Sequence, residues 1–375
     1  MWMLTVVIVW LLLMLLWGRF WRADQRLQMP EAPPAWPDVV TIIPARDEAS
    51  SIAEVVTAHK ATDYPGLSPV IVVDDSSADG TGDLARAAGA DVICAPALPN
   101  GWSGKLWALQ TGLAHAIAAY PDAKWILLTD ADIRHAPETL RALVTKGEAE
   151  GLSLVSLMAR LDARGFWAGL LVPAFVFFFQ KLYPFPRVNK PGHWCAGAAG
   201  GCVLIRRAAL DAIGGIAAMR GALIDDCTLG ALVKHTSPGR TIWLGLADQE
   251  VVSLRDNRAF GSIWTMVTRT AFTQLHHSSA LLLGAVAGMA FLYLLPPALT
   301  FWGAIDGDAM ALGSGFVAWA LMTILYAPTA RLYGQPGWRG VFLPAAAALY
   351  TAMTLGSALA HWRGRGGQWK GRTYG

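Results

Sequence analysis

Two aspartates separated by one alanine, Asp130 and Asp132, follow directly after the apolar run from Trp125 to Leu128. Side chains alternate along an extended chain, so both carboxylates point to the same side. Two neighbouring anions repel each other, and it is costly to remove them from water without a positive charge nearby. The pair therefore predicts a binding site that contains a cation, unless both side chains are simply solvated in a loop.

Acidic residues also follow two earlier apolar runs. Glu48 lies in "PARDEAS" after the run "DVVTIIPA", and Asp74 and Asp75 end the run "SPVIVVDD". Each alone has an ordinary explanation, such as a turn at Asp79 or an acidic first helical turn at Glu48. Three acidic strand ends in succession indicate a site instead. Carboxylates gathered in this way suit Mg²⁺ or Mn²⁺, and such an ion would in turn bind a diphosphate.

The acidic ends belong to a region, from about 37 to 255, in which β-rich runs alternate with helical stretches. The predicted strands are "DVVTIIPA", "SPVIVVDD", "DVICAP" and "KWILLTDAD". Helices are expected at 49–60, 79–90 and 105–120. This alternation predicts an α/β fold with a mainly parallel sheet flanked by helices, and ligands of such sheets collect at the carboxyl ends of the strands.

The composition indicates a protein that lies partly in a lipid bilayer. Of 375 residues, 54% are hydrophobic and 15% are charged. The net charge of +3 is too small to indicate a nucleic-acid partner. The four cysteines form no C-x-x-C pair, which argues against a zinc site or a disulfide framework.

Uncharged runs at both ends of the chain predict membrane helices. Residues 1–20 begin with an uncharged run, which we interpret as an uncleaved N-terminal anchor, and the arginines that follow it place residues 37–255 in the cytoplasm. A C-terminal bundle is expected at 278–361, with uncharged runs at 278–305, 309–330 and 340–360.

Two parts of this membrane plan have alternatives. A fourth crossing would leave the basic tail at 362–375 on the outside, so either the tail is tolerated there or 340–360 does not fully cross. The apolar segment 166–180, which contains Pro173, is expected to be interfacial, with an ordinary buried helix as the alternative. A second interfacial helix is expected within 256–277.

An ordered set of sequences, "IIPARDEA", "VIVVDDSSADGT", "GWSGKLWAL", "LLTDADI" and "IDDCTLG", resembles family 2 glycosyltransferases with the GT-A fold over roughly Val39 to Gly230. The chain resembles bacterial hopene-associated glycosyltransferases in the motif "GWSGKLWAL", in the later motif "MVTRTAFTQL" and in the predicted arrangement of its membrane helices. It more distantly resembles the ceramide glucosyltransferases. The resemblance implies transfer of one sugar, with inversion, from a nucleotide-diphosphate sugar such as a UDP-sugar to a lipid such as a hopanoid. It places the enzyme in the bacterial inner membrane.

The resemblance also implies roles on the donor side. Pro44 and Glu48 would line the nucleotide pocket, and Asp75 would hold the base, with Asp74 sharing this role or bracing the turn. The remaining donor-side residues are Lys105 near the donor, Asp130 facing the sugar or ribose, Asp132 as the direct ligand of the divalent cation, and Arg269 near the diphosphate. For Lys105, a surface position is the alternative.

On the acceptor side, the resemblance implies that Asp226 is the general base. Asp225 stands beside it where the family usually has glutamate. His193 and Trp194, in a glycine- and alanine-rich stretch, would stack on a sugar or shape the acceptor entrance. The alternatives are a helix N-terminus at Asp225 and a tight packing corner at His193.

One departure from the family pattern bears on the type of reaction. Processive polysaccharide synthases carry Q-x-x-R-W after the acidic pair, and "MVTRTAF" keeps only the arginine, Arg269. This loss favours transfer of a single sugar. Two other hypotheses stay open, a processive synthase and a catalytically inactive scaffold for hopanoid assembly. The donor sugar, the lipid and the oligomeric state do not follow from the sequence.

Overall fold

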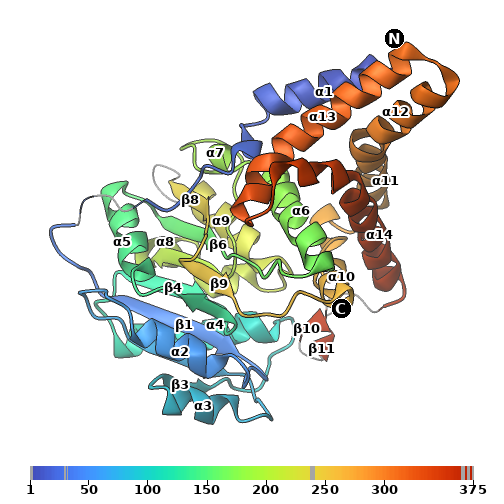
Figure 1. Ribbon diagram of the computed structural model, residues 1–375. Helices are drawn as coiled ribbons and strands as arrows, with labels where there is room; N and C mark the ends of the chain where they lie inside the picture. The colour runs from blue at the N-terminus through green and yellow to red at the C-terminus, as the bar shows by residue number, and fades with distance from the viewer. Residues whose placement is uncertain are drawn as a thin grey trace. The chain divides into compact units, whose positions relative to one another are not determined.

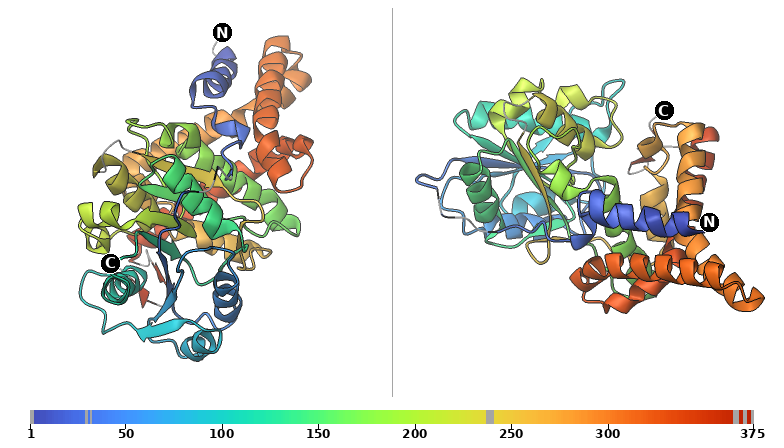
Figure 2. Two further views of the ribbon diagram at one scale, coloured as in Figure 1. Left: turned by 90° about the vertical axis from the view of Figure 1, so that its left-hand side faces the viewer. Right: turned by 90° about the horizontal axis from the view of Figure 1, so that it is seen from above.

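The computed structural model describes residues 3–28, 31, 33–236, 241–364, 368–369 and 372–373. The chain divides into two compact units, whose elements are drawn in Figures 1 and 2. The sheet unit consists of Gln25–Leu161 and Arg187–Arg255, and the helical unit of Met1–Asp24, Asp162–Pro186 and Asp256–Gly375. The segment 162–186 therefore groups with the terminal helices, although it lies inside the range predicted for the catalytic domain.

The sheet unit is built on a seven-stranded sheet with the strand order β3-β2-β1-β4-β7-β6-β8. Its strands are β1 (Val39–Ala45), β2 (Val70–Asp74), β3 (Asp91–Cys94), β4 (Trp125–Thr129), β6 (Leu154–Met158), β7 (Cys202–Arg206) and β8 (Ile242–Leu246). Neighbouring strands run parallel except at β7, which is antiparallel to both β4 and β6. The prediction of a mainly parallel sheet is confirmed.

Apolar strands explain why helices cover both faces of this sheet. Every residue of β1 (VVTIIPA) and of β4 (WILLT) is buried. Unbroken apolar runs are typical of parallel strands with helices on each side. The helices of the unit are α2 (Ile52–Lys60), α3 (Thr81–Ala87), α4 (Gly104–Ala119), α5 (Thr139–Ala149), α8 (Arg207–Ala212), η2 (Ile216–Met219) and α9 (Asp225–Thr236).

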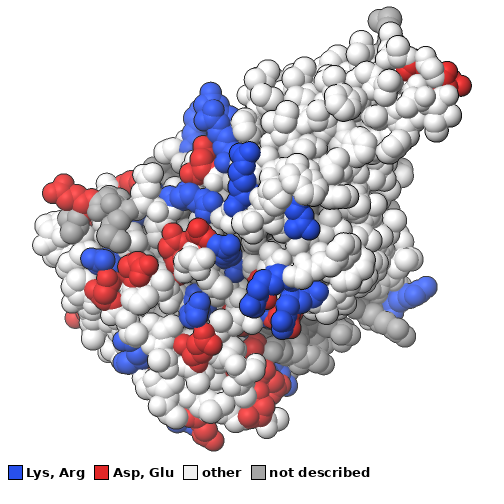
Figure 3. Space-filling model, in the orientation of Figure 1, with Lys and Arg blue, Asp and Glu red and all other residues white. Residues whose placement is uncertain are grey.

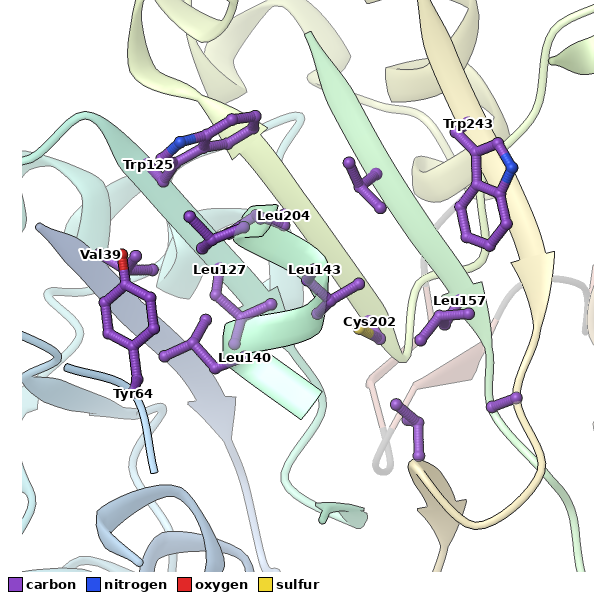
Figure 4. Packing of buried hydrophobic residues seen from close by; sticks show 14 of the residues in the cluster. Val39, Tyr64, Trp125, Leu127, Leu140, Leu143, Leu157, Cys202, Leu204 and Trp243 are labelled. Carbon is purple, nitrogen blue, oxygen red and sulfur yellow. The ribbon is translucent and has the colours of Figure 1, made fainter. Parts of the chain in front are cut away.

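Helices α4 and α5 pack on opposite faces of the sheet. A Cβ atom on Gly112 of α4 would lie 2.5 Å from Cγ2 of Ile42, so this close approach requires a residue without a side chain. On the other face, Leu143 of α5 shares a hydrophobic cluster with Trp125 and Leu127 of β4 (Figure 4). With both faces packed, the chemistry is left to the edge where the strands end.

A short antiparallel ribbon follows the two aspartates. Strand β5 (Ile133–His135) begins directly after Asp132 and pairs with β9 (Val251–Ser253). The backbone N–H of Leu254 donates a hydrogen bond to the carbonyl of Asp132 at 2.8 Å. The ribbon thus holds the backbone of Asp132 and brings the residues after β9 beside it.

The helical unit contains the apolar ends of the chain. Its helices are α1 (Leu4–Leu16), η1 (Phe20–Arg22), α6 (Phe166–Leu182), α10 (Phe260–Thr268), η4 (Thr273–Leu275), α11 (Ser279–Met289), η5 (Ala290–Leu294), α12 (Leu295–Asp306), α13 (Ala309–Leu332), η6 (Gly337–Phe342) and α14 (Leu343–Trp362). A short helix, α7 (Phe185–Val188), lies where the chain passes from this unit into the sheet unit. The last two strands, β10 (Gln368–Trp369) and β11 (Arg372–Thr373), pair antiparallel.

Four helical stretches of the described chain are long and apolar enough to cross a bilayer, by length and composition: Phe166–Val188, Ser279–Asp306, Ala309–Leu332 and Gly337–Trp362. The last three correspond to the runs predicted at 278–305, 309–330 and 340–360. Helix α1 has 13 residues, fewer than the ~20 that a crossing needs, so the anchor at 1–20 stays a prediction. In the predicted basic tail, Arg365 and Lys370 lie outside the described residues.

Helix α6 is longer than the interfacial segment predicted at 166–180. It continues through Pro173 to Leu182, and with α7 it forms an apolar stretch of 23 residues. The Tyr350 hydroxyl donates to the carbonyl of Leu171 at 2.9 Å, and Gln180 Nε2 donates to Thr329 Oγ1 at 3.2 Å. These buried hydrogen bonds tie α6 to α14 and α13, as expected for helices that associate in an apolar medium.

The two units differ in surface charge. In Figure 3, lysine, arginine, aspartate and glutamate side chains are scattered over the visible face of the sheet unit, whereas most of the visible surface of the helical unit is uncharged. Large apolar side chains are exposed on the helices that could cross a bilayer, including Ile305, Phe316 and Ile324. Apolar surface of this kind indicates a lipid contact or another partner.

Candidate active site

A pocket in the sheet unit lies where β1 and β4 end, on the face covered by α4. Pro44 comes from β1, Asp130 follows β4, and Lys105 lies in the first turn of α4. Thr129, Gly200, Asp225 and Asp226 also line the pocket. The structure therefore brings together five of the residues predicted for the site, from segments far apart in the sequence.

Lys105 is the cation between the carboxylates. Its Nζ lies 2.9 Å from Asp130 Oδ1 and 3.1 Å from Asp225 Oδ2. Burial alone lowers the pKa of Lys105, but the two carboxylates outweigh burial and hold this pKa well above its usual value. For Asp130 and Asp225, the neighbouring positive charge is therefore the ammonium group of Lys105. The predicted position of Lys105 near the donor stays a prediction.

Asp226 is held by two backbone donors at the start of α9. Its Oδ2 accepts a hydrogen bond from the N–H of Gly200 at 2.9 Å, and its Oδ1 accepts one from the N–H of Cys227 at 2.7 Å. Burial, followed by the charge of Asp225, raises the pKa of Asp226 to about 6. A carboxylate with a pKa close to the working pH is suited to accept a proton.

Gly200 allows the pocket to stay open beside this carboxylate. A Cβ atom at position 200 would lie 3.4 Å from Asp226 and 3.5 Å from Lys105 Nζ. Any side chain there would fill the space next to both charged groups. The sequence reasoning grouped Gly200 with the acceptor-side stretch but did not single it out.

Asp132 is paired with an arginine that the sequence reasoning missed. Its Oδ2 lies 3.0 Å from Nε of Arg255, the residue that follows Leu254 after β9. The carboxylate side chain is 13% exposed, whereas the arginine side chain is 44% exposed. The only sequence signal for this contact was a basic residue after a β-rich run.

The loops after β1 and β2 are bound to each other by hydrogen bonds. The N–H of Glu48 donates to Thr81 Oγ1 at 2.8 Å, and the N–H of Ala49 donates to Asp79 Oδ2 at 2.9 Å. Asp47 and Ser76 both have a positive φ, 49° and 58°, a conformation that is costly for residues other than glycine. Such strain is often found at functional loops and is held by the surrounding bonds.

The two aspartates of the second strand end have different surroundings. Asp74 Oδ1 accepts the N–H of Ser77 at 2.9 Å, which matches the predicted alternative of bracing the turn. Asp75 is 2% exposed, and NH1 of Arg46 lies 2.7 Å from its carbonyl oxygen and 3.4 Å from its Oδ2. The predicted role of Asp75 in holding a base stays a prediction.

Two of the residues predicted for the acceptor side, His193 and Trp194, are not among the residues that line the pocket. His193 Nδ1 accepts the N–H of Cys195 at 3.0 Å, and its ring stacks with Trp194 at a centroid distance of 5.5 Å. Trp194 is 70% exposed and so is free to meet a ligand from solvent. Arg269 follows α10 in the helical unit, and its contact with a diphosphate stays a prediction.

Residues 40–214 match the sequence profile of glycosyl transferase family 2. The chain carries a family 2 glycosyltransferase domain. Over 117 residues it is 31% identical to an uncharacterized protein from Methanocaldococcus jannaschii, covering 31% of this chain and 44% of that one. Over 97 residues it is 34% identical to the glycosyltransferase AglJ from Haloferax volcanii, covering 26% of this chain and 28% of that one. The chain thus spans less than half the length of each relative.

A solved structure of a mannosyltransferase has a similar fold. The mannosyltransferase PcManGT from Pyrobaculum calidifontis, in complex with GDP-Man and Mn²⁺, superposes with a TM-score of 0.54 at 20% identity, covering 93% of this chain and 99% of that chain. The family 2 domain described here therefore has the GT-A fold that its sequence predicts.

The family 2 domain offers carboxylates to a metal ion but no complete metal site of its own. Within the described ranges, no group of three or more histidine, cysteine, aspartate or glutamate side chains is arranged to hold an ion. Asp130 and Asp132 are oxygen ligands, and Mg²⁺ is commonly held by one or two carboxylates together with substrate phosphates and water. These residues fit an ion whose coordination is completed by a diphosphate.

Proposed function

We propose that the protein transfers one sugar from a nucleotide-diphosphate sugar, a UDP-sugar, to a lipid, with inversion at the anomeric carbon. The observation that carries this proposal is the position of Asp226. It is a buried carboxylate, its pKa is raised to about 6, and it lies in a pocket shared with Lys105 and Asp130. The family 2 domain around the pocket supplies the class of reaction.

The chemistry needs one displacement and one proton acceptor. The hydroxyl oxygen of the acceptor attacks the anomeric carbon, and the bond from that carbon to the β-phosphate oxygen breaks. Asp226 takes the hydroxyl proton as the new bond forms. The electron pair of the broken bond leaves with the nucleoside diphosphate. No covalent intermediate is required, so the product is inverted.

Lys105 keeps the carboxylate of Asp226 ionised at neutral pH, as this step requires. Lys105 lowers the pKa of Asp226, opposing burial and Asp225, so that the carboxylate is ionised at neutral pH. The ammonium also forms ion pairs with both Asp130 and Asp225. Because Asp225 reaches Lys105, the shorter aspartate in place of the usual glutamate still supplies a carboxylate to the pocket.

A divalent cation, Mg²⁺ or Mn²⁺, would be held by Asp132 and Asp130 and would offset the charge of the departing diphosphate. The Pyrobaculum mannosyltransferase that shares this fold was crystallised with GDP-Man and Mn²⁺. That complex supports a nucleotide-sugar donor and a divalent cation here.

A lipid acceptor is supported by the helical unit. Four described helical stretches could cross a bilayer, which indicates a membrane protein. A hopanoid is proposed because "GWSGKLWAL", "MVTRTAFTQL" and the membrane plan resemble the hopene-associated enzymes. By the same resemblance, the sheet unit would face the cytoplasm of a bacterial inner membrane.

The test is a screen of nucleotide sugars with the purified full chain, Mn²⁺ and a hopanoid polyol, read by mass spectrometry. A hopanoid that gains one hexose mass supports the proposal. A ladder of added hexoses identifies a processive synthase instead. Metal-dependent UDP binding without turnover of any donor identifies an inactive scaffold.

A further inference from the structure

The two aspartates after β4 are neutralised in different ways. Asp130 faces Lys105, whose ammonium is shared with Asp225 and whose side chain is 22% exposed. Asp132 faces Arg255, whose side chain is twice as exposed, at 44%. Lys105 is therefore enclosed between two carboxylates, whereas Arg255 reaches its aspartate from the solvent side.

The backbone keeps Arg255 beside Asp132 whatever its side chain does. Strands β5 and β9 pair through Ile133 and Ser253, and the N–H of Leu254 donates to the carbonyl of Asp132 at 2.8 Å. The guanidinium is attached through a flexible chain of three methylene groups. It can leave the carboxylate without any change in the ribbon, and it then stays within a side chain's length of it.

We propose that Arg255 is paired with Asp132 when no divalent cation is bound there. When the cation binds, the Arg255 side chain moves and its guanidinium pairs with the diphosphate of the donor. This inference rests on the proposed function. Arg255 Nε lies 3.0 Å from Oδ2 of Asp132, where a metal ligand would need a free oxygen. A guanidinium and a divalent cation on the same carboxylate would repel each other, so they compete for it.

The diphosphate is the natural second partner for the displaced guanidinium. Arginine presents a planar fork of donors that matches phosphate oxygens, and such bonds are strengthened by charge on both partners. Negative charge on the diphosphate increases as the sugar leaves. A cation delivered to it at that point would favour bond cleavage. Arg255 would thus be a donor-binding residue that also keeps Asp132 neutralised between turnovers.

The test compares two affinities in the detergent-solubilised full chain with Arg255→Gln. The first is the affinity for Mn²⁺ alone, measured from the electron paramagnetic resonance signal of the free ion. The second is the affinity for UDP at saturating Mn²⁺, measured by calorimetry. We expect Mn²⁺ to bind about two- to fivefold more tightly, because a partly exposed competitor is removed. We expect UDP to bind roughly tenfold or more weakly, because a charged hydrogen bond is lost.

Three variants serve as controls. Arg134→Gln removes an equally exposed guanidinium from β5, at 46%, which pairs with Glu54 instead, and both affinities should stay within about twofold of wild type. Arg255→Lys keeps the charge and should recover part of the UDP affinity. Asp132→Asn should lose the gain in UDP affinity that Mn²⁺ gives. Thermal unfolding of each variant reports any loss of fold.

The opposite signs of the two effects separate this proposal from a structural role. If both affinities fall together in Arg255→Gln, the arginine merely supports the ribbon. If the UDP affinity or the Mn²⁺ affinity of Arg255→Gln matches that of Arg134→Gln, the guanidinium of Arg255 does not move from Asp132 to the diphosphate. Wild type that shows no metal-dependent UDP binding overturns the proposed function as well. If wild type shows metal-dependent UDP binding and the Arg255 variants have the same Mn²⁺ and UDP affinities as wild type, only this inference is overturned.

Discussion

Asp226 combines burial with charge, and the balance between them determines its chemistry. Burial and the neighbouring Asp225 raise its pKa to about 6, while Lys105 and the N–H groups of Gly200 and Cys227 oppose that rise. The result is a carboxylate that is ionised at neutral pH and yet basic enough to accept a proton. Both expectations at the scale of single residues follow from this balance.

Asp226→Asn should separate binding from transfer. The amide keeps the shape of the side chain but cannot take the acceptor's proton, so the rate of sugar transfer should fall by ~10²–10⁴-fold. UDP affinity in the presence of Mn²⁺ should be unchanged, because the proposed contacts with the nucleotide and the cation come from Asp75 and Asp132. Asp225→Glu, which restores the usual family residue, should retain activity. Transfer by Asp226→Asn at the wild-type rate would place the base at another residue.

The rate of transfer should also depend on pH in one direction. The base works only when it is ionised, so kcat/KM should fall about tenfold per pH unit below pH 6 and should be level above it. Initial rates from about pH 5 to pH 8 test this, with thermal unfolding at each pH as the check on the fold. A rate that stays level down to pH 5 contradicts the raised pKa.

At the scale of elements, a buried lysine connects helix α9 to the segment 188–195, which contains His193 and Trp194. Lys234 of α9 is fully buried, and its Nζ donates to the carbonyls of Val188 and Cys195, the latter at 2.8 Å. The same helix begins at Asp225 and carries Asp226 in its first turn. The last turn of the helix that carries Asp226 is therefore connected to the stretch that includes His193.

Lys234→Met should destabilise the fold at pH 7 by roughly 1–3 kcal/mol, because buried carbonyls lose their donor. The effect should also change with pH. Burial lowers the pKa of Lys234 to about 8 from 10.5, so between these values the unfolded chain binds more protons than the folded one. Stability should therefore gain a rising contribution from pH 8 to 10.5, and the variant should lack it.

Denaturant titrations of wild type and variant at several pH values measure this difference. Lys60→Met, at an exposed position at the end of α2, is the matched control and should change stability by less than about 0.5 kcal/mol. Wild type and Lys234→Met with the same stability at every pH would show that the lysine does not anchor the helix.

At the scale of the whole molecule, the predicted membrane helices imply on which side of the bilayer the turns before and after α13 lie. Helix α13 has 24 residues, which at ~1.5 Å per residue is long enough to cross the ~30 Å core of a bilayer. If it crosses, the turn at 306–308 and the turn at 333–336 lie on opposite faces. Because of the arginines near the second turn, the positive-inside rule predicts that this turn faces the cytoplasm.

Single cysteines at exposed positions near each turn test this prediction, in a Cys94→Ser background because Cys94 is exposed. Ile305 and Trp338 are 87% and 62% exposed. An impermeant thiol reagent applied to intact spheroplasts should label Ile305→Cys, whereas Trp338→Cys should react only in inverted vesicles. Labelling of both from one side would show that α13 does not cross.

The sequence by itself determined the first four strands, the apolar helices of the C-terminal region and the prediction of a charged site after β4. Apolar runs predicted β1, β2 and β4, because a strand buried on both faces must be apolar along its length. Strand β3, which is only partly buried at the end of the sheet, was predicted from its β-rich residues. The aspartates after β4 predicted a charged site, because the carboxyl ends of parallel strands share one edge. Uncharged runs of sufficient length predicted the helices of the C-terminal region for the same local reason.

Only the tertiary structure decided which charges meet. Lys105 reaches both Asp130 and Asp225, and Arg255 reaches Asp132, because α4, α9 and the β5–β9 ribbon converge on one sheet edge. The raised pKa of Asp226 likewise depends on burial by chain segments that are distant in sequence. Strand pairing and helix packing set these contacts, and neither has a local signal. The same holds for α6, whose apolar sequence fits several environments and whose partners in α13 and α14 place it in the helical unit.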